Sequence, residues 1–413
     1  MTKTKVNLVM TSLIVFGLMT GCGSGSGSGN SESSKIKSEP GIIMTKQDAG
    51  KTEIQIRKLD DKVFIVIDWG DDSPVDSSKS YLFKHNYEQS GNYTIKINCP
   101  GITEFRCTNS DLTSIDISNS PELKKLTCFS NKLTCLDASK NIALEELDAG
   151  SNPLTSLDIS NCPALKTLSC SFTMLTNLNI NNNPALKELH LNKNKLTNLD
   201  ISKNTALEKL TLTDNQITSL DVSKATALKM LVCSNNPLTN LDVSKNTALE
   251  KLDCGSTKIT SIDVSKNTAL KELGCYNIQI TNIDISKNTA LNDLQCFDCK
   301  LLQSLDVSLN TELVALRLYN NEFTTIDVSK NPKLEYLNLW KSSNLISIVA
   351  GNNPQLNGVD IRECPQLSAQ ALNTFFETLH ANDLKKKEIL ITQTPGVDAS
   401  KKSIAEKKGW TLR

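Results

Sequence analysis

Most of the chain repeats one short pattern of apolar and polar residues. Each copy begins with Leu-x-x-Leu-x-Cys, as in Leu123–Cys128, and its second half reads Leu-Thr-x-Leu-Asp-Val/Ile-Ser, as in Leu154–Ser160. Repetition at a fixed period of 20–50 residues marks a repeat architecture. The last position of the first block recurs every 21 residues, with single-residue insertions near the end, at 107, 128, 149, 170, 191, 212, 233, 254, 275, 296, 318, 339 and 361.

Each copy predicts one coil of a solenoid. The Leu-x-Cys part alternates with a period of two, which is typical of a short strand with its apolar side inward. The Asn or Ser that follows turns the chain, and Asn-Thr-Ala-Leu or Asn-Pro-x-Leu returns it. A single coil cannot bury its own leucines, so stacked neighbours must build one continuous core with a row of parallel strands.

The repeats resemble the leucine-rich repeats of bacterial internalin-like proteins. They are most similar to the 21-residue variant in which Cys replaces one inward Leu, which is also found in surface lipoproteins of Bacteroidetes type. The resemblance covers residues 102–364. It implies a leucine-rich-repeat solenoid with parallel strands on the concave face and irregular or short 3-10 segments on the convex side. It also implies adhesion or host interaction, although fold alone does not identify a ligand.

Both ends of the solenoid are expected to carry caps, because terminal coils would otherwise expose their core. Asp68–Asp71, His85–Tyr87 and the strand pattern around them resemble PKD-like β modules, so a β capping module is predicted over residues 41–100. About 13 coils then fill residues 101–364. Beyond them, Ser368 is a suitable N-cap for a helix with an apolar face, and an α/β cap is predicted over 365–413.

The first residues predict a localisation signal. Lys3 and Lys5 precede the apolar run Val6–Met19, which has the length of a signal-peptide core, and Gly21-Cys22 resembles the end of a bacterial lipobox. We therefore expect a lipoprotein signal peptide at 1–21, lipidation of Cys22 and a flexible Gly/Ser linker at 22–40. The alternative is an ordinary secretory signal with an incidental Cys. The expected location is the cell envelope, with the lipid anchored in the outer membrane or at the cell surface.

Composition narrows the classes of function. Lys+Arg and Asp+Glu are both 45, so no basic excess favours nucleic acid. Aromatic residues make up 5% of the chain, and three histidines offer little material for acid–base chemistry. No phosphate loop, Gly-x-Ser-x-Gly or His-Glu-x-x-His motif occurs in the 413 residues. We therefore expect no enzyme activity, no cofactor and no metal.

Seven cysteines occupy the last position of the first block, which we call the ladder position. In the other coils Ala, Leu or Ile occupies it. This interchange predicts buried free thiols that act as small hydrophobic side chains. Disulfides between neighbouring parallel strands or a metal array are the alternatives, and neither suits a single-file ladder. Among the cysteines off the ladder no pairing is evident. The ladder cysteines are Cys107, Cys128, Cys170, Cys233, Cys254, Cys275 and Cys296.

An acidic residue recurs in the second half of nearly every copy. Stacked carboxylates suggest calcium, but turn Asp residues also commonly accept backbone N–H groups, and Asn179 takes one of the places. We favour the structural interpretation, both here and for Asp68, Asp71 and Asp72. The recurring residues are Asp116, Asp137, Asp158, Asp200, Asp221, Asp242, Asp263, Asp284, Asp306 and Asp327.

The outward strand positions provide the candidate binding site. The residue after the ladder position is small and polar in most coils, and then four consecutive coils carry rings. Contiguous exposed aromatic residues with polar and Arg neighbours are typical of binding surfaces, whereas packing under the C-terminal cap is the alternative. The predicted ligand-binding patch on the concave face is Tyr276, Phe297, Arg317, Tyr319, Tyr336, Asn338, Trp340, Asp360 and Arg362.

These observations favour a lipid-anchored surface protein that binds a protein partner on a host or neighbouring cell through its concave face. A glycan-binding module is the second hypothesis, because rings beside polar groups also stack on sugars. A structural envelope scaffold without an external ligand is the third. A footprint over many coils would favour a protein, and one confined to the four rings would favour a sugar.

Overall fold

A computed structural model describes residues 39–413 apart from residue 352. The expected signal peptide at 1–21, the lipidation site Cys22 and most of the linker at 22–40 lie outside the described residues. Among those described, no helix is both long enough and apolar enough to cross a bilayer. The longest helix, α1 (Ala369–Thr378), has 10 residues.

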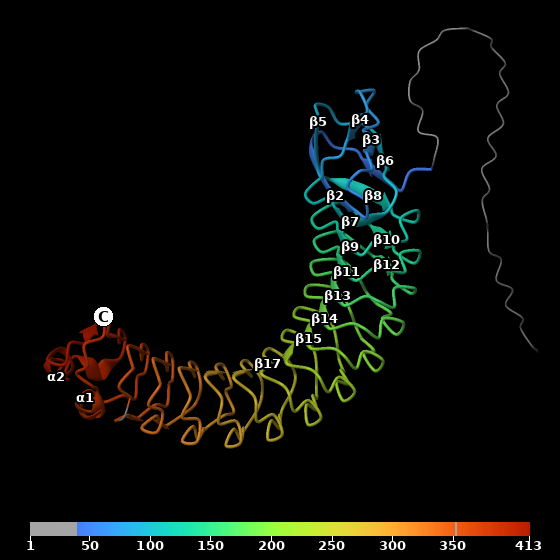
Figure 1. Cartoon of the computed structure of the whole chain (residues 1–413). Helices are drawn as coiled ribbons and strands as arrows, with labels where there is room; N and C mark the ends of the chain where they lie inside the picture. Colours follow the sequence, from blue (N-terminus) through green and yellow to red (C-terminus); the bar gives the residue numbers. More distant parts are fainter. Residues whose placement is uncertain (1–38, 352) are drawn as a thin grey trace, which may run out of the picture. The chain divides into compact units, whose positions relative to one another are not determined.

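The repeats form a parallel sheet on the concave face, as the sequence predicted (Figure 1). Equivalent residues pair from coil to coil, so that Leu210 lies beside Leu231 and Leu231 beside Leu252. The strands, in order across this sheet, are β7 (Ile102–Arg106), β9 (Lys125–Thr127), β11 (Glu146–Asp148), β13 (Thr167–Ser169), β14 (Glu188–His190), β15 (Lys209–Thr211), β16 (Met230–Val232), β17 (Lys251–Asp253), β18 (Glu272–Gly274), β19 (Asp293–Gln295), β20 (Ala315–Arg317), β22 (Tyr336–Asn338) and β24 (Gly358–Asp360).

Burial follows the predicted alternation within each coil. In β17, Leu252 and the ladder residue Cys254 just after the strand are fully buried, whereas Lys251 and Asp253 are only partly buried. The turn that follows needs a positive φ, and in the preceding coil Asn235 supplies it at 55°. Asn, Asp and Ser recur at this position because their short polar side chains tolerate the left-handed region better than bulky ones.

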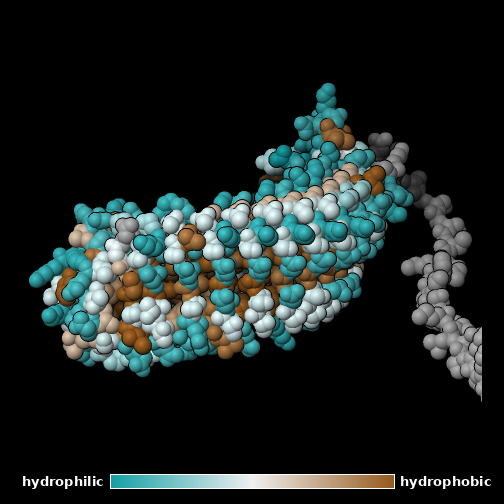
Figure 2. All heavy atoms as spheres, turned by 90° about the horizontal axis from the view of Figure 1, so that it is seen from below, coloured by the Kyte–Doolittle hydropathy of each residue, from teal (hydrophilic) through white to brown (hydrophobic). Residues whose placement is uncertain are grey.

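The convex side carries few strands. The parallel pairs β10 (Cys135–Asp137) with β12 (Ser156–Asp158) and β21 (Thr325–Asp327) with β23 (Ser347–Val349) lie near its two ends. Between Asp158 and Thr325, every strand of the described chain belongs to the concave sheet. Figure 2 shows the convex side with a hydrophobic band between more hydrophilic rows. Leucines and isoleucines of the second half-repeat retain slight exposure, for example Leu178 at 9% and Ile262 at 7%.

Two sheets pack together before the first coil. Their core contains Trp69 and isoleucines from facing strands. One sheet has the order β4 (Asp76–Ser78), β3 (Ile65–Asp68), β6 (Tyr93–Asn98), β1 (Ile42–Lys46) and β8 (Leu112–Asp116). In the other, β2 (Gly50–Lys58) pairs antiparallel with β5 (Leu82–Tyr87) and with β7. Because β7 also pairs with β9, the concave sheet begins inside this N-terminal module.

The C-terminal cap prolongs the same sheet. β25 (Glu388–Leu390) pairs parallel with β24, and β26 (Thr411–Leu412) pairs with β25. Ser368 caps α1 as predicted, since its side chain accepts a hydrogen bond from the N–H of Ala371. A 3-10 turn η1 (Pro395–Val397) and α2 (Ser403–Glu406) complete the cap. The chain thus forms the predicted solenoid with β and α/β ends, while the domain boundaries at 100/101 and 364/365 stay predictions.

Candidate binding surface on the concave face

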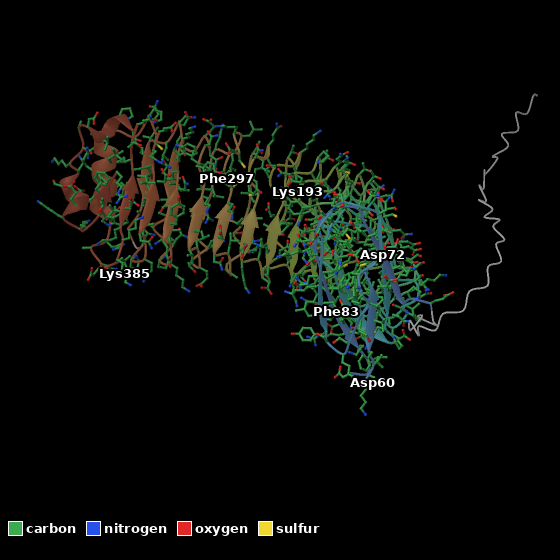
Figure 3. The ribbon with its side chains drawn as sticks, turned by 90° about the horizontal axis from the view of Figure 1, so that it is seen from above. Asp60, Asp72, Phe83, Lys193, Phe297 and Lys385 are labelled. Carbon is green, nitrogen blue, oxygen red and sulfur yellow. The ribbon has the colours of Figure 1, made fainter. Side chains whose placement is uncertain are left out.

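Four rings from successive coils stack on the concave face. Tyr276 and Phe297 have ring centroids 4.6 Å apart and are nearly parallel at 7°, and Phe297 and Tyr319 lie 4.2 Å apart at 13°. Trp340 continues the row at 5.9 Å from Tyr319, tilted by 44°. We call these four side chains the aromatic ridge. Figure 3 shows Phe297 just beyond the end of its strand, along the same edge of the concave sheet as Lys193.

Tyr276 occupies a niche formed by two glycines. A Cβ at Gly255 would collide with the ring of Tyr276, and one at Gly274 would lie 3.4 Å from its Cε1. Its hydroxyl lies 3.4 Å from Oδ2 of Asp253, on the floor of the niche. Burial raises the pKa of the Asp253 carboxyl, and burial together with this carboxylate raises the pKa of Tyr276. The first ring of the ridge is therefore held in place by its surroundings.

Charged groups close the other end of the ridge. Trp340 donates from Nε1 to Oε1 of Glu363 at 2.9 Å, and the guanidinium of Arg362 lies 5.7 Å from its ring centroid. Arg362 in turn donates to both carboxylate oxygens of Asp360, at 2.9 and 2.7 Å, and this bond raises its pKa. Asp360 is only 2% exposed. It therefore positions Arg362 instead of offering its carboxylate to a ligand.

The remaining residues of the predicted patch line the middle of the strands. The Arg317 guanidinium lies 5.9 Å from the Tyr336 ring centroid and donates to Asp293 at 2.5 Å. Asn338 donates to the Tyr336 hydroxyl at 3.1 Å and accepts from the backbone N–H of Trp340 at 3.0 Å. The structure thus brings the nine predicted residues into neighbouring positions on one face. That this face binds a ligand stays a prediction.

Two surface features were missed from the sequence. A pocket of about 720 Å³ lies beside the ridge, between three successive turns, and is lined by residues including Lys258, Gln279 and Asp298. Phe172 and Met174 are 55% and 46% exposed, more than any ring of the ridge, and Lys193 lies over Phe172. The pocket depends on the shapes of three turns. Only the apolar residue types of Phe172 and Met174, in a column of polar turn residues, could have signalled that patch.

In this structure every cysteine of the described residues has a free thiol. Those on the ladder are fully buried, and burial raises the pKa of Cys128 to about 12 and of Cys170 and Cys233 further. Such thiols are poor nucleophiles in the folded protein and act as core side chains. Cys135, by contrast, is exposed.

The acidic row shapes turns, as the structural interpretation predicted. Each carboxylate accepts the backbone N–H two residues on, for example Ser202 to Asp200 at 2.9 Å and Ser223 to Asp221 at 2.8 Å. Asn179 does the same toward Asn181 at 3.1 Å. In the part of the chain that the structure describes, no cluster of three or more His, Cys, Asp or Glu could hold a metal ion.

Each histidine has a local partner. His85 lies 2.7 Å from Oδ2 of Asp71, His190 lies 3.2 Å from Oγ1 of Thr211, and His380 lies 2.7 Å from the carbonyl oxygen of Leu356. His85 also stacks on Trp69 inside the N-terminal module. Solenoids of this kind present extended concave surfaces for binding, and the geometry of this one is that of a binding scaffold.

Stacked coils with parallel concave strands define a leucine-rich-repeat protein. A family model described as leucine-rich repeats in two copies matches residues 226–267. Among solved structures, the functional domain of internalin J from Listeria monocytogenes, which includes a cysteine ladder, is 31% identical with a TM-score of 0.60. The match covers 70% of this chain and 64% of that domain, so this chain spans less than two thirds of its length. The chain is thus an internalin-like leucine-rich-repeat protein with 21-residue, cysteine-ladder repeats.

Two other solved structures share the fold. A leucine-rich-repeat protein of Leptospira interrogans is 22% identical with a TM-score of 0.64, over 74% of this chain and 82% of that one. An internalin, inlF, of Listeria monocytogenes is also 22% identical, with a TM-score of 0.52 over 63% of this chain and 80% of that one. No curated protein sequence matches the chain significantly.

Proposed function

We propose that the protein is a lipid-anchored, adhesin-like cell-surface module whose concave face binds a protein partner. The observation that carries this proposal is the aromatic ridge, because four half-buried rings form one contiguous apolar surface on the open side of the sheet. Aromatic residues and Arg dominate the energetics of protein interfaces, and both gather here. Cys22 carries the lipid, and the Gly/Ser linker joins it to the N-terminal module.

The stacking of the rings favours a protein over a glycan. A sugar stacks on the flat face of a ring, and the faces of Tyr276, Phe297 and Tyr319 are covered by one another at 4.2–4.6 Å. The outer face of Tyr276 lies against Gly255. What these three rings offer is ring edges and the hydroxyl of Tyr319, which suit the side chains and backbone of a protein.

The charges around the ridge are already paired. Arg317 binds Asp293, and Arg362 binds Asp360. A partner therefore meets side chains whose positions are set before binding, which lowers the entropy cost of forming the interface. The ridge is expected to act as a preformed hot spot within a larger footprint over neighbouring coils.

The test uses the mature chain from residue 22 with Cys22→Ser on two arrays, one of host-surface and matrix proteins and one of glycans. The double variant Tyr319→Ala/Trp340→Ala should lose the protein signal by about 30-fold or more, as expected when hot-spot side chains are truncated. The double variant Phe129→Ala/Phe172→Ala removes exposed rings outside the ridge and should bind as the parent does.

Other outcomes would contradict the proposal. A glycan signal lost in the ridge variant would assign the ridge to carbohydrate, and silence on both arrays would favour an envelope scaffold. The anchor is tested separately by growing the producing bacterium with a labelled fatty acid. We expect the label on the parent chain and none on a Cys22→Ala chain.

A further inference from the structure

Two cysteines beneath the aromatic ridge lie next to each other. Cys296 belongs to the ladder, and Cys299 follows it in the sequence Cys296-Phe297-Asp298-Cys299. Their sulfur atoms are 3.9 Å apart, and both side chains are fully buried. Between them the chain carries a ring of the ridge, Phe297, and Asp298, which lines the neighbouring pocket.

The turn at Cys299 lacks the asparagine side chain that hydrogen-bonds the preceding coil in other turns. In the coil of Asn236, the side chain at this position donates to the Leu212 carbonyl at 2.8 Å and accepts from the Ile217 N–H at 3.0 Å. Three successive coils then have other residues there, namely Thr257, Ile278 and Cys299.

Those three turns also border the pocket beside the ridge. The Cys299 side chain reaches the preceding coil through one thiol hydrogen bond, to the Cys275 carbonyl at 3.1 Å, while its backbone N–H donates to Oδ1 of Asn321 in the next coil at 2.7 Å. An S–H group is a weaker donor than an amide. The turn that carries Phe297 is therefore joined to the preceding coil more weakly than the turns that have asparagine at this position.

We propose that Cys296 and Cys299 form an intrachain disulfide that fastens this turn, and with it the middle of the aromatic ridge. The inference rests on the proposed function, because an exported protein meets the oxidising conditions in which disulfides persist. The two thiols lose two protons and two electrons as the S–S bond forms. A disulfide oxidant, such as oxidised glutathione, accepts them and leaves as two thiols.

Cys275 is the competing partner, because it holds the ladder position of the preceding coil, whose strand pairs with that of Cys296. A disulfide between Cys275 and Cys296 would join neighbouring parallel strands and strain the disulfide dihedral. Cys299 lies on a turn, and its sulfur already faces that of Cys296. The hydrogen bond with Cys296 and burial raise the pKa of Cys299, so thiolate is scarce in the folded chain. The bond therefore forms while the chain folds and is then shielded from reductants.

The experiment refolds the mature chain from residue 22, carrying Cys22→Ser, out of reducing denaturant into a mixture of reduced and oxidised glutathione. Free thiols are then alkylated in denaturant, and the chain is digested with trypsin. The peptide of residues 288–300 contains both cysteines, because Lys287 and Lys300 flank the cleavage sites. We expect most of this peptide to be unalkylated and about 2 Da lighter than the dithiol form, for the loss of two hydrogens.

Three variants locate the bond. Cys299→Asn introduces the residue that other coils use, and Cys296→Leu introduces the ladder residue found at Leu318; each should leave one alkylated thiol in the peptide. Cys275→Ala should leave the disulfide intact. Amide exchange over residues 297–301 should be about tenfold slower in the oxidised parent than in Cys299→Ser, as expected for a tied turn.

Three results would overturn the inference: two alkylated thiols in peptide 288–300, a glutathione adduct on it, or a cross-link to the peptide of residues 272–287. Because the oxidant is supplied in the buffer, these results do not depend on export. A missing lipid on Cys22 would contradict the proposed anchor and leave the disulfide test unaffected.

Discussion

At the scale of single residues, the aromatic ridge depends on two positions without a side chain. The ring of Tyr276 fills the space beside Gly255 and Gly274, and neither glycine has a positive φ. Both therefore serve to leave room, and not to supply a turn conformation. Since each ring covers the next, moving the first ring is expected to disturb the whole row.

Gly255→Ala should destabilise the protein by about 1–3 kcal/mol, because the new Cβ collides with the Tyr276 ring and forces it outward. It should also weaken near-ultraviolet circular dichroism from the stacked rings. Urea unfolding measures the first effect.

Gly150→Ala is the matched control, since Gly150 occupies the same column and a Cβ there meets the Ser171 carbonyl oxygen at 3.0 Å. Its loss of stability should be smaller, and the ring signal should not change. Equal behaviour of the two variants would show that the niche at Gly255 has no special role.

The sequence predicts which residues face outward but not how they contact one another. Strict alternation along each strand places the nine patch residues on one face. Whether rings stack, or whether Asp360 is buried under Arg362, depends on rotamers and neighbours that a residue pattern does not contain. Cys296 and Cys299 form a Cys-x-x-Cys motif in the sequence. Because Cys296 was grouped with the buried ladder residues, its contact with Cys299 was not predicted.

At the scale of the coil, buried asparagines join many of the turns to the preceding coil. Asn236 is 3% exposed, and its amide satisfies backbone groups from both the preceding coil and its own turn. A second row, on the return segment, donates to two carbonyls of the coil before, as Asn246 does to Val222 and Ala225. These amides satisfy backbone groups that the short three-residue strands leave unpaired.

Asn236→Ala should cost about 2–4 kcal/mol, because it removes the partner of the buried Ile217 N–H and of the Cys233 carbonyl. Thr257→Ala, one coil further on, should cost about 1 kcal/mol, since Thr257 makes a single hydrogen bond to the Cys254 carbonyl. Urea unfolding followed by amide exchange checks both, and the loss of protection should centre on the altered coil. Equal costs would contradict the assigned role of the asparagine.

The coils were predictable because their contacts are local in pattern. Equal spacing fixes the register, so that Leu231 must lie beside Leu252 once the coils stack. The N-terminal module was harder, because its sheets join distant segments, as when Ile43 of β1 pairs with Asp116 of β8. Sequence alternation predicts such strands but does not say which of them become neighbours.

At the scale of the whole molecule, a row of aspartates repeats one charge along the solenoid. Hydrogen bonds from the backbone N–H and hydroxyl of the serine two residues on lower the pKa of Asp200, Asp221 and Asp242. The same bonds lower the pKa of Asp158, Asp263, Asp284 and Asp306.

Because their folded pKa values lie below the unfolded value of about 3.9, these groups stabilise the fold fully above pH ~5. The contribution should disappear as the pH falls below about 4. The triple variant of Asp200→Asn, Asp221→Asn and Asp242→Asn should show a shallower acid decline in melting temperature, since Asn179 shows that an amide can keep the turn. An unchanged acid slope in this variant would contradict the prediction.

The scarcity of strands on the convex side has a mechanical consequence. Between Asp158 and Thr325 the coils are tied together by hydrogen bonds mainly on the concave sheet and at the turns. The outer segments have no strand-to-strand backbone ladder there and are joined through buried asparagines such as Asn267, which donates to the Val243 and Asn246 carbonyls. They should therefore separate more easily than the strands of the inner sheet. Bending stiffness in this stretch is set by the inner sheet, and a load applied across the two ends would be taken up there as a change of curvature. Tyr276, Phe297 and Tyr319 follow strands of the hydrogen-bonded inner sheet, so a change of curvature should largely keep their spacing while the outer segments separate.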